Sequence, residues 1–461
     1  MSKEFDEAMS LARCDTALHG QVYRETSARK ITRRGILWLG QTCNLRCHFC
    51  YFLDRIQNME HPEHAFMSLD KARQICRTLV DYYGNNSIDI QGGEPTLYPP
   101  IYDLVEYCAE IGLSPTLITN AIALSKLENA EHYKQAGIRD FLISVQGLGA
   151  VYDRIVGRSG AHIWQMKALR NLQQVGVPFR FNTVLSKAAL PQLMDISRLA
   201  VATGAGVVNF LGFNPFNDQT TGKRSTENVP GYDEIREPLE AAMDYLVEQG
   251  MEVNVRYLPL CLVPEHQRTN AYGFRQLPYD LHENDYASWS WTDLPAQRTG
   301  GIPLTPPFGL GRRLPLGAAR APLRTLDRKF PKVGKQLHQV KQALERNWAK
   351  RQETETDGAV LELLYQEDGK TRATEYTGYG HVAACAACSL RSVCDGVYGD
   401  YAELFGVDGL RPVRLGSDIR DPQHYTRRQY KVVHPLDRAW LEQGDGPVAE
   451  PVLEKLAKRA G

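Results

Sequence analysis

The sequence predicts an α/β protein built on a parallel barrel, and a repeated strand–helix pattern carries this prediction. From Gly35 onward one unit repeats: an apolar, β-branched run, a turn, and then an amphipathic stretch of about 12 to 18 residues. Strands that alternate with helices in this way pair in parallel. No uninterrupted apolar run reaches about 18 residues, so we expect no membrane span.

Six apolar runs fit the strand position of this repeat. They are residues 35–40, 87–91, 115–119, 140–145, 178–185 and 206–212. Between them, residues 68–83 and 162–175 place apolar side chains at intervals of three and four, which predicts helices. Residues 232–249 are expected to form the last barrel helix, and a further strand at 252–257 leads to Cys261.

Composition narrows the class of protein. The chain has 461 residues, of which 43% are hydrophobic and 23% charged, and this excludes collagen, a coiled coil and wholesale disorder. Its 54 basic and 54 acidic residues argue against an overall electrostatic attraction to nucleic acid. The first residues mix acids and bases without an apolar segment, so no secretion signal is expected and the predicted location is cytoplasmic.

Three of the ten cysteines follow the first predicted strand with the spacing CxxxCxxC: Cys43, Cys47 and Cys50. Three thiolates on one loop can hold three irons of a four-iron cluster and leave the fourth iron open to an external chelator. A zinc site would normally recruit four protein ligands. His48 is the nearby candidate, but it faces away if the cysteines converge, so the spacing favours iron and sulfur over zinc.

A second motif, Gly92-Gly93-Glu94-Pro95, follows the second predicted strand at its carboxyl end, where barrel active sites are assembled. The two glycines would let the backbone approach a bound ligand closely, and the Glu94 carboxylate can accept hydrogen bonds from an ammonium group. Alone, this tetrapeptide could be a simple turn. Together with the cysteine loop on the preceding strand it is highly specific.

With these two motifs in a βα repeat, residues 36–215 resemble the radical S-adenosylmethionine superfamily. The resemblance implies a partial (β/α)6 TIM-like barrel. It implies that Cys43, Cys47 and Cys50 ligate a four-iron four-sulfur (4Fe-4S) cluster whose open iron is chelated by S-adenosylmethionine. Such an enzyme takes an electron from a flavodoxin- or ferredoxin-type donor, cleaves S-adenosylmethionine to a 5′-deoxyadenosyl radical, and abstracts a hydrogen atom from its substrate.

The resemblance also assigns contacts with S-adenosylmethionine. Gly92–Pro95 would line the methionine amino group, and Phe49 would lie near the adenine. Contacts with ribose, carboxylate and adenine fall to residues near the strand ends: Ser144, Gln146, Asn182, the backbone of Leu211–Phe213 and, for the carboxylate, Arg158. For Ser144, Gln146 and Asn182 the alternative is that they only satisfy polar groups at the ends of strands.

A second cysteine set, Cys385, Cys388 and Cys394, has the spacing CxxCx5C, and Cys261 is a candidate fourth ligand. Spacing alone allows zinc or an iron-sulfur cluster. The set resembles the auxiliary-cluster domains called SPASM and twitch, but Tyr398 and Pro278 stand where a SPASM domain has further cysteines. We therefore expect one auxiliary 4Fe-4S cluster, whose fourth site is Cys261 or is open to substrate, and which assists electron transfer or binds substrate.

The remaining cysteines are not expected to be ligands. Cys76 and Cys108 fall in apolar helical patterns, and Cys14 stands apart from any motif. They are most simply small hydrophobic residues or exposed thiols.

The expected organisation has five parts: an N-terminal extension (1–32), the radical S-adenosylmethionine barrel (33–250), an auxiliary-cluster domain (251–297 and 356–425), a basic insertion with a helix (298–355) and a C-terminal tail (426–461). Residues 298–335 contain nine Lys or Arg and one acid. This stretch is either a solvated connector or an arm that meets an anionic partner such as nucleic acid.

The favoured substrate is a small molecule or natural product. The alternative is a ribosomally made peptide; we expect no leader-binding domain within the first 30 residues, which lowers that interpretation. A different class of function is a non-catalytic iron-sulfur or zinc scaffold. The acidic and aromatic segment after Cys261 has a default interpretation as aromatic packing under a loop. The alternative hypothesis is that Tyr279, Asp280, His282 and Trp289 close the substrate pocket.

Overall fold

The computed structural model describes eleven segments of the chain: residues 2–17, 23–25, 34–50, 65–81, 85–215, 224–276, 284–285, 378–422, 424–425, 428–429 and 431–433. The basic stretch at 298–335 and the expected helix after it lie outside these residues.

Seven consecutive strands form one parallel sheet, and they pair in the order in which the chain makes them. They are β2 (Arg34–Trp38), β3 (Ser87–Gln91), β4 (Ser114–Thr119), β5 (Asp140–Ser144), β6 (Phe179–Leu185), β7 (Val207–Gly212) and β8 (Glu252–Arg256). All six expected strands are present, and the further strand continues the same sheet as β8. Short strands β9 (Ala271–Tyr272) and β10 (Asn284–Asp285) pair at its two ends.

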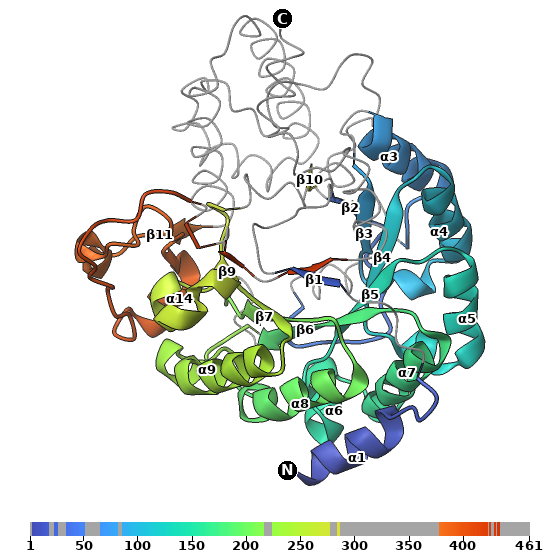
Figure 1. Ribbon diagram of the computed structural model, residues 1–461, viewed down its shortest axis with the longest axis horizontal. Coiled ribbons are helices and arrows are strands. Elements are labelled where there is room, and N and C mark those ends of the chain that lie inside the picture. The colour runs from blue at the N-terminus through green and yellow to red at the C-terminus, as the bar shows by residue number, and fades with distance from the viewer. Residues whose placement is uncertain are drawn as a thin grey trace, which may run out of the picture.

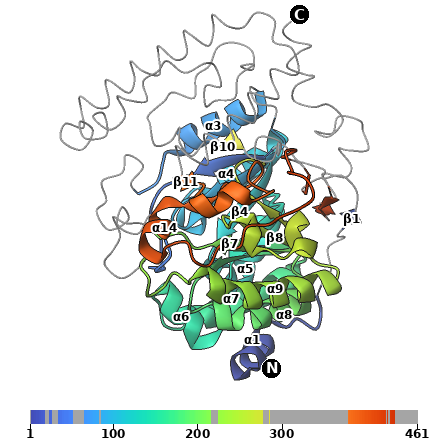
Figure 2. The same cartoon turned by 90° about the vertical axis from the view of Figure 1, so that its left-hand side faces the viewer.

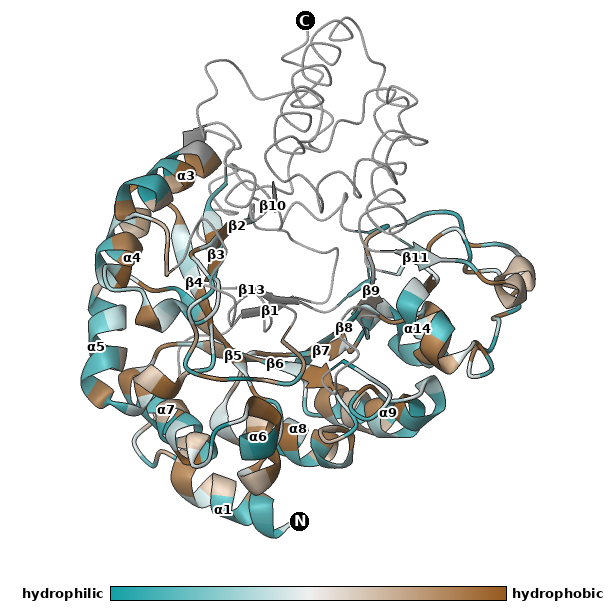
Figure 3. Cartoon of the chain, turned by 180° about the vertical axis from the view of Figure 1, so that it is seen from behind, coloured by the Kyte–Doolittle hydropathy of each residue, from teal (hydrophilic) through white to brown (hydrophobic). Residues whose placement is uncertain are grey.

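The helices cover the outer, convex side of this curved sheet (Figure 1). They are α3 (Leu69–Asp81), α4 (Ile101–Glu110), α5 (Leu127–Gln135), α6 (Gly149–Val156), α7 (Ala161–Val175), α8 (Leu193–Thr203) and α9 (Tyr232–Glu248). Figure 3 shows hydrophobic and hydrophilic residues alternating along α3, α4 and α9, as expected of amphipathic helices. The partial TIM-like barrel is confirmed. No helix in the described part of the chain has both the length and the hydrophobicity of a membrane span.

Side chains alternate between the two faces of the strands. In β6, Phe179 and Phe181 are buried in the core, whereas Arg180 and Asn182 between them are partly exposed. Because successive side chains of a strand point to opposite faces, the polar set lies on the concave face that the helices leave open. The strand register places Ser144, Asn182, Asn209 and Asn254 in one row across β5 to β8.

No periodic signal predicts structure in the first 30 residues, yet α1 (Lys3–Ala12) forms there. Ser2 caps the helix by accepting a hydrogen bond from the Phe5 amide at 3.2 Å. Phe5, Ala8 and Ala12 are buried, and α1 packs on α7 and α8 of the outer layer. Two of the three buried side chains are alanines, so the apolar pattern of this helix is weak in the sequence.

The C-terminal segment reaches the barrel. β13 (Lys431–Val433) pairs antiparallel with β1 (Tyr23–Glu25), and the nearby Gln429, fully buried, donates a hydrogen bond to Asn254 on β8. Figure 2 shows β1 at one side of the molecule and α6 and α14 (Gly399–Phe405) at the other. Strand β1 from the first part of the chain and β13 from its last part therefore pair with each other, and Gln429 connects the segment before β13 to the barrel.

Buried ion pairs lie near the amino ends of the strands. Asp140, the first residue of β5, pairs with Arg180 of β6 at 2.7 Å and accepts a hydrogen bond from the Thr116 hydroxyl. Burial alone would raise the pKa of Asp140, but the positive charges of Arg180, Arg139 and Arg34 outweigh it and hold the pKa well below its usual range. The ionised carboxylate therefore stabilises the folded state.

An Asp140→Asn variant is expected to lose about 3 kcal/mol of unfolding free energy at pH 7, because Arg180 is left buried without its partner. Since the folded-state pKa is lowered, this stabilisation is complete above the unfolded pKa of about 3.9 and is lost only as the pH falls below it. Urea unfolding measures the difference. Glu131→Gln, at an exposed position on α5, is the control, and an equal effect of both variants would contradict the prediction.

Candidate functional site

The first cysteine loop follows β2 and is fastened to the end of α6. The backbone amides of Arg46 and His48 donate to the carbonyls of Val156 and Ile155 at 2.9 and 3.0 Å. Leu45 is buried in a small hydrophobic cluster with Tyr152, Ile155 and Val156, against which Cys43 and Cys47 pack. All three cysteines of the loop are half-buried, and the Leu45 amide donates to the Cys43 sulfur at 3.4 Å. The loop is thus held in place by its backbone hydrogen bonds and by the packing of Leu45.

The two glycines after β3 lie directly against the stem of this loop. Gly93 donates its amide to the Gly40 carbonyl at 2.7 Å, and Glu94 donates to the Thr42 carbonyl at 2.8 Å. A Cβ atom on Gly93 would lie 2.2 Å from the Thr42 carbonyl oxygen, and one on Gly92 would lie 2.7 Å from that of Gly40. The close approach that requires glycine here is therefore made to the protein's own backbone.

Glu94 is almost fully buried, and its carboxylate is satisfied within the protein. Oε1 accepts from the Thr119 hydroxyl at 2.5 Å and from both the amide and the hydroxyl of Thr96, while Oε2 accepts from the Asn120 amide at 2.8 Å. Burial raises the pKa of this carboxyl, although the hydrogen bonds from Thr119 and Asn120 act in the opposite direction. Glu94 ties the loop after β3 to the end of β4.

Two amide side chains outside the predicted site residues complete this connection. Asn120 donates from Nδ2 to Oδ1 of Asn44, inside the cysteine loop, at 2.8 Å. Gln165 of α7 is fully buried and places its Nε2 2.9 to 3.1 Å from the Tyr152 hydroxyl and the carbonyls of Asn120 and Ser144. Asn120 follows a predicted strand directly, which is a usable signal; Gln165 lies within a helix and gives none.

The expected strand-end residues differ in their surroundings. Gln146 is buried, with Nε2 donating to the Asn182 carbonyl at 3.0 Å and Oε1 accepting from the Val184 amide at 2.8 Å, so both ends of its amide bind β6. Ser144, Asn182 and Leu211 are partly exposed, the first two in one row across the sheet. These three side chains therefore have room for a ligand contact.

An arginine connects the loop after β7 with the cysteine loop. Arg224 donates to the Phe49 carbonyl and, at 3.0 Å through Nε, to the Asn214 carbonyl. Its guanidinium lies 4.9 Å from the ring centre of Phe213, on which His48 stacks at 5.9 Å. His48 therefore faces Phe213, and burial lowers its pKa to about 4, with the Arg224 charge adding to the effect.

The second cysteine set converges. Cys261, which follows β8, lines one pocket together with Cys385, Cys388 and Cys394. Backbone amides donate to two of the sulfurs at 3.4 Å: those of Leu260 and Gly396 to Cys394, and that of Val413 to Cys388. The chain thus gathers all four predicted auxiliary ligands, from positions more than a hundred residues apart in the sequence.

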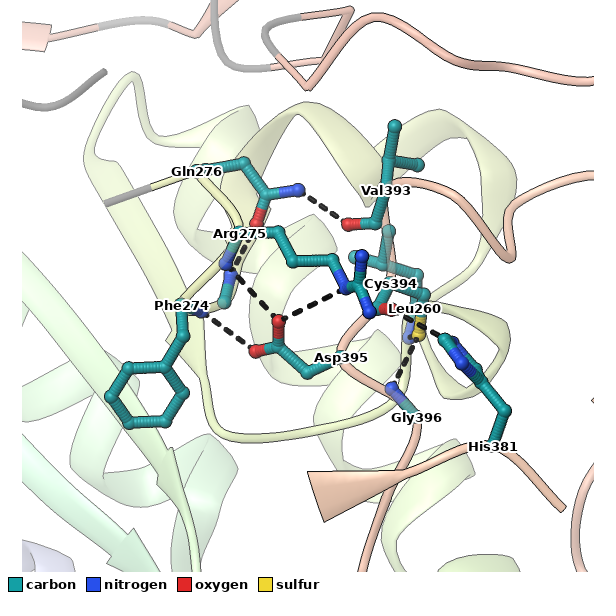
Figure 4. A network of polar contacts seen from close by, with 10 residues as sticks. Leu260, Phe274, Arg275, Gln276, His381, Val393, Cys394, Asp395 and Gly396 are labelled. Carbon is teal, nitrogen blue, oxygen red and sulfur yellow. Dashed lines mark hydrogen bonds and ion pairs between the residues drawn. The ribbon is translucent and has the colours of Figure 1, made fainter. Parts of the chain in front are cut away.

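A buried carboxylate fastens the segment after β9 to this pocket (Figure 4). Asp395, next to Cys394, accepts hydrogen bonds from the amides of Phe274 and Arg275 at 2.7 and 3.1 Å. Gln276 donates to the Val393 carbonyl, and His381 lies 3.0 Å from the Cys394 carbonyl. Burial raises the pKa of Asp395 to about 6 against the effect of the two amides. These contacts fix the position of Cys394 relative to the barrel.

A tyrosine joins the two sites. Tyr379 of β11 (Tyr379–Gly380) is buried, and its hydroxyl accepts from Asn214 at 2.6 Å and donates to the Tyr257 carbonyl at 3.3 Å. β11 pairs with β12 (Val397–Tyr398), which follows Cys394 closely. The loops after β7 and β8 are thereby tied to the auxiliary cysteines.

Comparison with known proteins addresses the barrel. Residues 39–187 match the model of the family described as the radical SAM superfamily. This segment is a radical SAM domain. Such a domain indicates an enzyme, and it implies a 4Fe-4S cluster and S-adenosylmethionine.

The relatives of this radical SAM domain include two kinds of enzyme. The AdoMet-dependent heme synthase of Oleidesulfovibrio alaskensis is 30% identical over 174 residues, which is 37% of this chain and 43% of the relative. The PqqA peptide cyclase of Rhodopseudomonas palustris is 31% identical over 171 residues, 37% of this chain and 44% of the relative. The chain therefore spans less than half the length of the curated relatives that it matches.

Among solved structures, that of SuiB from Streptococcus suis is similar to this chain. The superposition covers 49% of this chain and 49% of SuiB, with 22% sequence identity and a TM-score of 0.40.

Gly93 tests how the radical SAM domain holds its cysteine loop. In a Gly93→Ala variant the new methyl group would overlap the Thr42 carbonyl, so the loop stem must shift, at an expected cost of about 2 to 3 kcal/mol in unfolding free energy. We expect a lower iron content after reconstitution, measured per polypeptide. Gly416→Ala, where a Cβ meets nothing within 4 Å, is the matched control. Equal iron content in the two variants would show that the close approach is dispensable.

Proposed function

We propose that this protein is a radical S-adenosylmethionine enzyme that abstracts a hydrogen atom from a small-molecule or natural-product substrate. Cys43, Cys47 and Cys50 hold its 4Fe-4S cluster. The observation that carries the proposal is the fastening of their loop to Gly93 and Glu94 at the carboxyl edge of the sheet. When bound, the cluster and S-adenosylmethionine supply reductive cleavage of the sulfonium bond to methionine and a 5′-deoxyadenosyl radical.

The thiols fit this group. Burial raises the pKa of Cys43 to about 12, and the negative charges of Glu94 and Cys50 contribute in the same direction. Burial and the other two cysteines also raise the pKa of Cys47. Thiolates crowded in this way need a cation to compensate them, and metal coordination deprotonates a thiol outright.

The chain's own residues would position the cofactor and exclude water. Gly92 and Gly93 bring the loop after β3 against the cysteine loop, and Phe49 is held through its carbonyl by Arg224. Ser144 and Asn182 offer polar atoms on the concave face, and we assign them, with Arg158 and the backbone at Leu211, to contacts with S-adenosylmethionine. A primary radical attacks whatever lies nearest, so a rigid, closed site is required.

We also propose an auxiliary 4Fe-4S cluster held by Cys261, Cys385, Cys388 and Cys394. All four line one pocket, and burial raises the pKa of Cys394 to about 12 and that of Cys261 in the same direction. With four protein ligands the cluster has no position left for substrate, which favours a role in electron transfer. All ten cysteines lie in the described residues and none forms a disulfide, in keeping with the proposed cytoplasmic location.

The relatives support two kinds of substrate. One is named for making heme, a small molecule, and one for cyclising the peptide PqqA, at nearly equal identity. We favour the small molecule and retain peptide maturation as the second candidate. A peptide substrate would be revealed if 5′-deoxyadenosine formation in the presence of candidate peptides transferred deuterium from a labelled peptide to the nucleoside.

The test of the proposal uses the reconstituted full-length protein without oxygen. With dithionite and S-adenosylmethionine we expect equal amounts of methionine and 5′-deoxyadenosine, measured by mass spectrometry. If neither product forms although iron is bound, the protein is the non-catalytic iron-sulfur scaffold, and the proposal is wrong.

A further inference from the structure

Arg224 connects two segments that the proposed function assigns to S-adenosylmethionine. It donates to the carbonyl of Phe49, in the cysteine loop, and from Nε to the carbonyl of Asn214 at 3.0 Å. Asn214 directly follows Phe213, whose ring centre lies 4.9 Å from the guanidinium. Arg224 is 7% exposed, so these contacts are made inside the protein. The loop after β7 and the cysteine loop are thereby held against each other.

The side chain of Asn214 extends this connection to the segment that carries the auxiliary cysteines. Its Nδ2 donates to the Tyr379 hydroxyl at 2.6 Å, and that hydroxyl donates to the Tyr257 carbonyl at 3.3 Å. Burial raises the pKa of Tyr379, so the hydroxyl keeps the proton that the second bond needs. One hydroxyl thus accepts a hydrogen bond from the loop after β7 and donates one to the loop after β8.

The ring of Tyr379 is fixed by its neighbours. The rings of Tyr398 and Phe274 pack on it, with centres 5.5 and 5.9 Å away. Tyr379 belongs to β11, which pairs with β12, and just before β12 a Cβ on Gly396 would overlap the Gly380 carbonyl. Because both the ring and its strand are closely packed, the hydroxyl stays in place and can hold Asn214.

We propose that Tyr379 and Asn214 are positioning residues for S-adenosylmethionine: they hold the loop after β7 in place and, through Arg224, the cysteine loop. This inference rests on the proposed function, in which S-adenosylmethionine would contact both segments. Ordering a segment on binding costs free energy, so a ligand binds more tightly when the segment is already in place. The hydrogen bond between Asn214 and Tyr379 therefore strengthens binding of S-adenosylmethionine, whereas the bond-breaking step does not depend on it.

A Tyr379→Phe variant removes the hydroxyl and keeps the packed ring, so Asn214 loses the acceptor that fixes it. We expect the KM for S-adenosylmethionine to rise about tenfold, the lower end of the effect of losing an outer-shell partner. The rate of 5′-deoxyadenosine formation with dithionite at saturating S-adenosylmethionine should stay within about twofold of the wild type, because only binding is weakened. Equilibrium dialysis with labelled S-adenosylmethionine, without reductant, should show the same rise in the dissociation constant of the reconstituted full-length protein.

Asn214→Ala removes the other partner of the same hydrogen bond. We expect it to raise the KM and the dissociation constant as Tyr379→Phe does. The double variant Asn214→Ala/Tyr379→Phe should show no larger rise than either single variant, because the two residues act through one contact. Independent effects would multiply to about a hundredfold, and that result would contradict the proposal.

Tyr401→Phe is the matched control, since it removes another buried tyrosine hydroxyl from the same part of the chain. That hydroxyl accepts from the Tyr232 amide at 2.7 Å, at the start of α9 in the outer layer. A general loss of stability would affect both variants alike, so we expect the control to keep the wild-type KM. An unchanged KM in Tyr379→Phe, or an equal rise in the control, would overturn the positioning proposal and leave the function intact. If the wild type neither binds nor cleaves S-adenosylmethionine, the proposed function itself is wrong.

Discussion

A Cys47→Ala variant is expected to form 5′-deoxyadenosine more than about 100-fold more slowly than the wild type, because losing a direct ligand exceeds the 10- to 100-fold cost of losing an outer-shell partner. Cys47 lies at the centre of the loop and packs in the same hydrophobic cluster as Cys43. The next residue, His48, donates its backbone amide to the Ile155 carbonyl. The measurement is product formation with dithionite and S-adenosylmethionine.

The matched control for this variant is Cys14→Ala. Cys14 is partly exposed, and its thiol lies 3.6 Å from the Thr16 hydroxyl, away from either cysteine set. We expect the control to keep the wild-type iron content and rate. An unchanged yield from Cys47→Ala would remove Cys47 from the cluster and with it the proposed site.

The second large effect concerns the auxiliary cysteines. A variant with Cys385, Cys388 and Cys394 all changed to alanine is expected to lose about four irons per polypeptide, the content of one 4Fe-4S cluster. It should still form 5′-deoxyadenosine with dithionite, because the barrel loop has its own ligands and anchors. Iron and zinc analysis together with the product assay measure both parts.

The single variant Cys261→Ala decides the fourth ligand. Because Cys261 lines the same pocket as the other three, its loss should lower the iron bound at that site, while Cys14→Ala should not. Full iron content in Cys261→Ala would mean that the fourth position is open. Zinc in place of iron in the wild-type pocket would contradict a redox role.

The strands of the fold were predictable because each is an apolar run between turns, and the parallel order follows from the alternation with helices. Helices α3, α7 and α9 begin and end within two residues of their expected bounds. Helix α1 was not predicted, because its buried Ala8 and Ala12 give the sequence little hydrophobic contrast. The basic insertion and the four residues proposed to close the substrate pocket, Tyr279, Asp280, His282 and Trp289, lie outside the described residues.

The site was predictable where motifs sit next to one another in sequence, and less so where side chains bridge distant strands. The adjacency of the cysteine loop and Gly92–Glu94 follows from neighbouring strands β2 and β3. The Glu94 carboxylate accepts hydrogen bonds from Thr119 and Asn120, and Arg224 donates to the Phe49 carbonyl. These are tertiary contacts that leave no local pattern in the sequence. Gln146 was expected either to contact S-adenosylmethionine or to satisfy polar groups at a strand end. Both ends of its side-chain amide hydrogen-bond to the backbone of β6.

The pairing of β1 with β13 has a consequence for how the chain acquires its structure. Strands β2 to β8 each pair with a neighbour that is next in the chain, so the sheet can grow as the polypeptide leaves the ribosome. β1 must wait for almost the entire chain to be made, because its partner is the last described strand. Closing so long a loop carries a large entropic cost, which makes this contact a late step of folding. The auxiliary cysteines, which precede β13, are synthesised before that step, so both cysteine sets are present in the chain before β1 and β13 pair.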